Sequence, residues 1–133
     1  MTTTQESMRA KGIRALIVEP GPVLFSLTGV RWGRSERTFA FVLPARGEPA
    51  YVLPAFEETR ARELIQPGAD IRVWQEDESP FLRIAQVLRD RGIASGRVAI
   101  EDSVRFFIFD GIRQASPKLE LVSAANLLKV SGV

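Results

Sequence analysis

Short apolar runs recur along the chain, separated by polar segments rich in glycine and proline. The first run, residues 15–18, is apolar at every position, which is typical of a strand covered on both faces. Two later runs flank the sequence PARGEP, whose glycine and two prolines predict a loop between antiparallel strands. We therefore predict six strands, at 15–18, 39–43, 50–53, 71–74, 98–100 and 119–122.

Helical spacing and capping signals occupy the segments between these strands. Ser79 followed by Pro80 has the form of an N-cap and a first helical residue. The segment 23–29 fits either a short helix or an extended piece, and the polar segment 31–37 fits a loop. The predicted helices run from Thr3 or Thr4 to Gly12, from 55 to 65, from Ser79 to Gly92, from Ser103 to about Ala115, and onward from Ser123.

The order of these elements predicts the fold class. One helix and one strand precede the hairpin, and helix–strand units follow it. Strands joined by helices favour parallel pairing with right-handed crossovers, while the hairpin adds antiparallel strands. We therefore predict a single α/β domain over residues 1–133 with three layers, a mixed sheet of about six strands with helices on both faces.

Composition narrows the possible chemistry. The 133 residues include neither cysteine nor histidine, so thiol catalysis, zinc–thiolate sites and the commonest general base are absent. We predict no catalytic residue, no metal ligand and no cofactor in this chain. The 18 basic and 16 acidic residues are interspersed, which does not indicate a nucleic-acid surface. No apolar run has the length of a membrane helix or a signal peptide, so we expect a cytoplasmic location without membrane contact.

The segment Arg31-Trp32-Gly33-Arg34 is the most site-like part of the sequence. A tryptophan flanked by two arginines is suited to holding a carboxylate or a neighbouring backbone. The alternative is a polar loop with one partly buried tryptophan. Because residues 31–37 offer few anchors of their own, we predict that this loop is poorly ordered in the isolated domain.

The helix predicted to end near Ala115 carries large apolar residues on two faces. One face gathers Val104, Phe107, Ile108, Gly111, Ile112 and Ala115. Phe106 and Phe109 fall on the opposite, polar face. We expect these two rings either to form an interface with another domain or subunit, or to be covered within this domain or lie flat at its surface.

The remaining acidic and glycine-rich segments have simpler interpretations. Glu101 and Asp102 follow a strand, where α/β sites form, but helix capping by Asp102 or Ser103 accounts for them better. The run 76–78 lacks the spaced ligands of a calcium or magnesium site and is interpreted as a solvated loop. The glycines form no phosphate-binding pattern.

Several phrases of the sequence resemble the N-terminal domain of the creatinase/prolidase/aminopeptidase P family. They are MRAKGIRALIV from residue 8, LTG at 27–29, FVLPARGEPAYVLP at 41–54, IRVWQEDESPFLRIAQVLRDRG at 71–92, and VAIEDSVRFFIFDGIRQASPKLELVSAANLL at 98–128. The resemblance lies in their order and spacing. The sequence departs from the family phrase at Pro22, Ser26 and Val30, and the basic phrase that usually follows the domain is replaced by LLKVSGV.

This resemblance implies a non-catalytic domain of an Xaa-Pro dipeptidase or related metallohydrolase. In the family, a second domain of pita-bread fold binds two divalent metal ions and carries the chemistry, and we expect that catalytic domain to be absent from this chain. Manganese, cobalt or zinc is expected only there. The implied roles are homodimerisation and capping of the active site, with Arg31, Trp32 and Arg34 contacting substrate in trans and Phe106 and Phe109 at the interface. The alternative is a free-standing α/β module that binds a protein or a small ligand; a receiver or dinucleotide-binding domain lacks its motif here.

Overall fold

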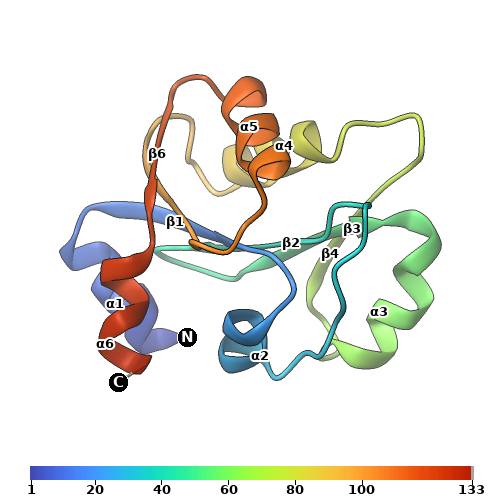
Figure 1. Ribbon diagram of the computed structural model, residues 1–133, viewed down its shortest axis with the longest axis horizontal. Coiled ribbons are helices and arrows are strands. Elements are labelled where there is room, and N and C mark those ends of the chain that lie inside the picture. The colour runs from blue at the N-terminus through green and yellow to red at the C-terminus, as the bar shows by residue number, and fades with distance from the viewer. Residues whose placement is uncertain (133) are drawn as a thin grey trace.

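A six-stranded mixed sheet forms the centre of the molecule (Figure 1). The computed structural model describes the backbone of residues 1–132 and the side chains of residues 1–128. The strands are β1 (Ile13–Val18), β2 (Ala40–Pro44), β3 (Ala50–Pro54), β4 (Asp70–Trp74), β5 (Gly96–Ile100) and β6 (Leu119–Ser123). They lie in the order β4-β3-β2-β1-β5-β6, and the predicted mixed α/β sheet is confirmed.

Strand direction follows the connections that the sequence predicts. β2 and β3 form the antiparallel hairpin, and β2 is also antiparallel to β1. The other three pairs, β1–β5, β3–β4 and β5–β6, are parallel. Parallel strands β1 and β5 therefore lie side by side near the centre, and their carboxyl ends point to the same edge of the sheet.

Helices cover both faces of the sheet, as predicted. They are α1 (Thr2–Ala10), α2 (Pro22–Thr28), the 3-10 turn η1 (Ala55–Glu57), α3 (Glu58–Leu64), α4 (Pro80–Asp90), α5 (Phe106–Ala115) and α6 (Ala125–Gly132). Figure 1 shows α4 and α5 on one face and α1, α2, α3 and α6 on the other. Within the described residues, no helix is both long enough and apolar enough to cross a bilayer.

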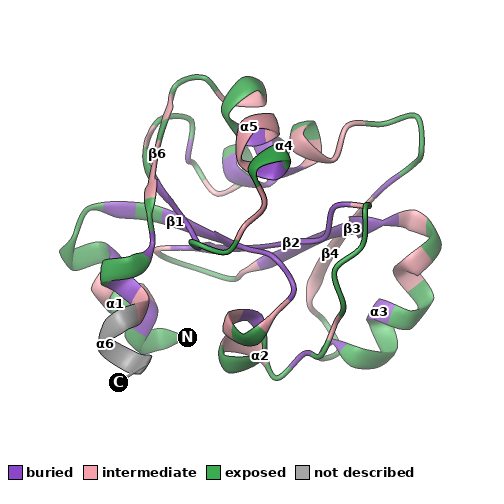
Figure 2. Ribbon diagram, viewed as in Figure 1, coloured by how far each residue is buried: buried purple, intermediate pink, exposed green. Residues whose placement is uncertain are grey.

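The core consists of two apolar layers, one on each side of the sheet. Alternate residues of β1 divide between them: Leu16 and Val18 pack in the layer under α1, α2, α3 and α6, and Ala15 and Ile17 in the layer under α4 and α5. Every one of these four side chains is fully buried. This explains why the run has no polar position, and Figure 2 shows the central strands buried along their length.

Several local predictions are confirmed and three are wrong. Ser79 caps α4 by accepting a hydrogen bond from the Leu82 amide, and the ambiguous segment 23–29 belongs to helix α2. Neither Thr3 nor Thr4 caps α1, which begins at Thr2. The predicted helix over 55–65 divides into η1 and α3.

The third wrong prediction is the start of α5. Ser103 does not cap this helix, which begins three residues later, at Phe106. The reason is a competing hydrogen bond: the Ser103 amide and hydroxyl both donate to the carboxylate of Glu101, at 2.9 and 2.5 Å. The serine therefore belongs to the loop before the helix, where its hydrogen bonds are made.

Candidate functional site

Two buried carboxylates mark the carboxyl ends of β1 and β5. Glu19 follows β1 directly and is 1% exposed, and Glu101 follows β5 directly and is 8% exposed. A charged side chain that deeply buried requires compensating partners. Both residues have such partners, and these come from the loop at 31–37 and from the segment that leads into α5.

Arg105, the residue before α5, is the main partner of Glu19. Its guanidinium donates from Nη2 at 2.7 Å and from Nε at 3.1 Å to Oε1 of Glu19. Its backbone amide donates to Oε2 at 2.9 Å. The second Nη2 contact of Arg105, at 2.7 Å, is with the carbonyl oxygen of Ser35 in the loop. One arginine thus ties β1, the loop and the start of α5 together.

Arg34 approaches the same carboxylate from the loop. Its Nη1 lies 3.7 Å from Oε2 of Glu19 and donates at 2.8 Å to the Ser103 carbonyl oxygen. Its Nη2 donates to the Ser103 hydroxyl at 2.7 Å, and its Nε to the Pro20 carbonyl at 2.8 Å. Every nitrogen of this guanidinium is therefore engaged within the chain.

These arginines occupy the place where α/β sheets usually bind ligands. Such sites form at the carboxyl ends of adjacent parallel strands whose following helices lie on opposite faces. Here β1 leads to α2 on one face and β5 leads to α5 on the other (Figure 1). The guanidinium groups of Arg34 and Arg105 fill that crevice. The arrangement favours a structural role for the crevice over a small-ligand site.

Arg31 and Trp32 are placed differently from Arg34. The Arg31 guanidinium lies over the Phe25 ring, 4.1 Å from its centroid, and within the described residues it makes no ion pair. Trp32 packs on Phe39 at 4.9 Å between centroids and carries the Arg60 guanidinium on its ring at 4.6 Å. The structure therefore leaves the exposed Arg31 available to a second molecule.

The expectation that the loop has few anchors is wrong. Besides the Arg34 and Arg105 contacts, Arg37 forms an ion pair with Glu76 in the turn after β4. The hydrogen bond from Arg37 holds the pKa of Glu76 below its usual range. The sequence interpretation counted only the residues of the loop itself, whereas most of its partners lie far away along the chain.

The two candidate interface rings at α5 have unequal exposure. Phe106 is 74% exposed, and Phe109 is half-buried against the layer under α4 and α5. Their rings stack at 6.2 Å between centroids. Phe107, which the helical pattern places on the buried face, is 44% exposed. That placement is wrong because α4 meets α5 one turn later, where the Phe81 ring packs on Gly111.

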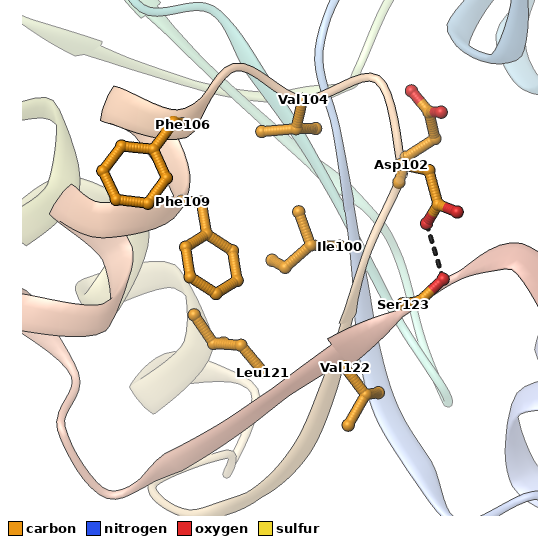
Figure 3. Close-up of a pocket in the computed structure, with 9 residues that line it drawn as sticks. Ile100, Asp102, Val104, Phe106, Phe109, Leu121, Val122 and Ser123 are labelled. Carbon is orange, nitrogen blue, oxygen red and sulfur yellow. Dashed lines mark hydrogen bonds between the residues drawn. The ribbon is translucent and has the colours of Figure 1, made fainter.

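A cavity of about 500 Å³ opens beside these rings (Figure 3). Phe109, Ile100 and Leu121 point into it, and Phe106 lies at its mouth. On its far side the Ser123 hydroxyl donates to Asp102 at 2.6 Å. The walls are mostly apolar and the chain has no histidine to activate a hydroxyl. The cavity is therefore suited to holding an apolar side chain.

The described residues do not fit a divalent metal ion. Within residues 1–128 no three carboxylates converge as metal ligands would. The acidic run 76–78 is divided between two arginines: Glu76 pairs with Arg37 and Glu78 with Arg83.

Sequence reasoning missed Glu19 and Arg105, the two residues at the centre of this network. Glu19 carried a usable signal, because it is an acid placed immediately after an all-apolar strand, where α/β sheets position functional carboxylates. Arg105 carried none, since its partner lies 86 positions away.

Comparisons with known proteins agree with this architecture. A family model described as the creatinase/prolidase N-terminal domain matches residues 1–130. An uncharacterised peptidase of Schizosaccharomyces pombe is 32% identical over an alignment 123 residues long, and the match covers 82% of this chain and 26% of the relative.

Two solved structures have folds similar to that of this chain. The dipeptidase PepE from Mycobacterium ulcerans superposes with a TM-score of 0.85 at 27% identity, covering 97% of this chain and 34% of that one. The N-terminal domain of an Xaa-Pro dipeptidase from Lactobacillus brevis superposes with a TM-score of 0.81 at 17% identity, covering 96% and 95%. The chain thus spans about a quarter of its S. pombe relative and about a third of the M. ulcerans chain.

Proposed function

The chain belongs to the creatinase/prolidase N-terminal domain family, and we propose that it is the non-catalytic domain of a metal-dependent Xaa-Pro dipeptidase. The observation that carries the proposal is the family match over residues 1–130, combined with relatives about three times as long as this chain. The metal ions, whether manganese, cobalt or zinc, belong to a catalytic domain outside this chain. The described residues contain no group of ligands for them.

The domain's own contribution is to shape and cap the active site of a homodimer. The loop at 31–37 supplies the cap, with Arg31 and Trp32 reaching substrate bound by the partner subunit. Arg31 is suited to this because a guanidinium binds a carboxylate by two parallel hydrogen bonds, and its own is not paired with an acid. Arg34, first considered for the same contact, is fully engaged inside the chain and holds the loop in place.

The exposed rings of α5 supply the subunit contact. Phe106 projects from the surface beside an apolar cavity, an arrangement common at the centres of protein interfaces. Phe109 supports it from below through the ring stack. A ring that exposed gains substantially from burial, at about 25 cal/mol per Å² of apolar area.

The first test concerns activity. The isolated 133-residue chain, supplied in turn with Mn²⁺, Co²⁺ or Zn²⁺, is expected to show no hydrolysis of an Xaa-Pro dipeptide, because residues 1–128, whose side chains the structure describes, include no group of ligands that could hold the ions. The matched positive control is the full-length protein, whose hydrolysis should stop on addition of a chelator. Chelator-sensitive hydrolysis by the pure isolated chain would overturn the proposal.

The second test concerns the cap. In the full-length dimer, Arg31→Ala is expected to raise KM with little change in kcat, if the contact is equally strong in the ground and transition states. Arg46→Ala is the matched control, since Arg46 is also exposed but lies in the β2–β3 turn. Kinetics unchanged in both Arg31→Ala and Trp32→Ala would remove the loop from the active site.

A further inference from the structure

The carboxylate of Glu19 is shared between two surface segments that are far apart in sequence. Its oxygens accept hydrogen bonds from the side chain and the amide of Arg105, the residue before α5. One of them also lies 3.7 Å from the Arg34 guanidinium in the loop. Glu19 itself lies at the end of β1, and only 1% of it is exposed to solvent. It is therefore placed to influence both segments without contacting anything that binds to them.

Further hydrogen bonds close a ring around this carboxylate. Arg34 donates to the carbonyl and hydroxyl of Ser103, just before α5, and Arg105 donates to the carbonyl of Ser35 in the loop. Each segment thus holds the other through an arginine whose position depends on Glu19. Charge-assisted bonds of this kind are stronger than neutral ones, and more so where water is excluded.

The two segments that meet here are the two functional surfaces of the proposed function. The loop carries Arg31 and Trp32, and α5 carries Phe106 and Phe109. Movement of the Arg105 guanidinium would disturb both at once, because it contacts Ser35 as well as Glu19. Hydrogen-bond and ion-pair networks of this type can couple two surface segments.

We propose that Glu19 is a positioning residue that locks the 31–37 loop to the start of α5, so that the cap and the subunit contact form one preformed surface. Association through α5 would then bring the loop, already held in place, to the partner's substrate. The functional meaning of this lock rests on the proposed function. Its physical basis is the network alone, which the isolated chain already contains.

The test uses the isolated chain and the two indole N–H signals of its NMR spectrum, since the sequence contains two tryptophans. Trp32 reports on the loop, and Trp74, whose indole donates to the buried Thr38 carbonyl, serves as an internal control. The Arg105 amide reports on the start of α5, because Glu19 accepts its hydrogen bond. Glu19→Gln preserves the size of the side chain and removes its charge.

In Glu19→Gln, the Trp32 indole signal is expected to shift and broaden and the Arg105 amide to exchange roughly tenfold faster or more, as local opening becomes easier. The Trp74 signal should stay in place. In Arg34→Lys, only the Trp32 signal should move, because Glu19 still accepts the Arg105 amide. If Glu19→Gln does not fold, Glu19→Asp gives the same readout, since it withdraws both oxygens by one methylene.

Three results would overturn the inference. They are an unchanged Trp32 signal, a change confined to one of the two segments, and an equal change at Trp74, which would indicate general loosening. None of these measurements needs substrate or a second subunit. Failure of the dipeptidase proposal would therefore leave the lock intact, and failure of the lock would leave the dipeptidase proposal intact.

Discussion

The loop at residues 31–37 and the first turn of α5 are both exposed, but opposite kinds of contact hold them in place. The loop has no regular structure and is fixed by hydrogen bonds that Arg34 and Arg105 make across the chain. The helix is fixed from beneath by Ile108 and Ile112, which are buried in the layer shared with α4. The loop, whose apolar burial is limited to Trp32, is thus held largely by hydrogen bonds, whereas the helix rests on the core.

The two segments differ in how their anchoring residues and their exposed residues are arranged. On α5 the rigid part and the exposed part are separate, so Phe106 projects freely while Ile108 anchors the helix. In the loop the residues that anchor and the residues that project alternate, since Arg34 is engaged inside while Arg31 faces outward. On α5, substitutions should therefore affect either the anchoring of the helix or its exposed surface. In the loop, one substitution is more apt to affect both.

The largest expected effect on stability comes from replacing the buried residue Ile108 of α5, and it is compared with replacement of the exposed ring of Phe106. Ile108→Ala is expected to lower the free energy of unfolding by about 2–5 kcal/mol, because it opens a cavity in a fully buried layer. Phe106→Ala, only two residues away in the chain, should cost less than about 1 kcal/mol, since most of its ring already faces water. Urea unfolding followed by circular dichroism measures both variants.

The reverse order of these two values would contradict the division of α5 into anchor and contact. Comparable large losses in both variants would mean that the Phe106–Phe109 stack supports the helix itself. In that case Phe106 would belong to the fold and its assignment to a subunit contact would lose its basis.

The sequence predicted the anchored parts of the molecule better than the exposed ones. The run 15–18 identifies a strand buried on both faces because its pattern is complete within four residues, and Ser79 identifies its helix start because a cap is a local contact. The hairpin is equally local, with its turn residues between two apolar runs. Each of these signals lies within a short window of the chain.

The start of α5 depends on one near and one distant partner. Ser103 has the form of a cap, but Glu101, two residues before it, takes its amide and hydroxyl, and α5 starts only where Arg105 has bonded to Glu19, 86 positions away. The number of contacts that anchor the loop was underestimated because some of its partners are distant, since Arg34 meets Ser103 from 69 positions away. No periodicity in the sequence reveals which carboxylate a given arginine will reach.

The smallest expected effect comes from removing the exposed ion pair between Arg37 and Glu76. This change tests whether that pair or the buried network holds the loop in place. Glu76→Gln removes the partner of Arg37 at a position open to solvent, where screening and side-chain entropy leave such pairs little net effect. Because Arg37 lowers the pKa of Glu76, the pair is charged at pH 7, and any contribution it makes is lost only as the pH falls through that lowered pKa. At pH 7 we therefore expect the Trp32 indole signal and the unfolding midpoint to remain close to those of the parent chain.

Arg34→Ala is the matched comparison and should displace the Trp32 signal clearly, since it removes the bonds to Pro20 and Ser103 beside a buried carboxylate. If Glu76→Gln displaced that signal as far as Arg34→Ala, the loop would be held at its exposed end, and the buried network could no longer be the reason for its order.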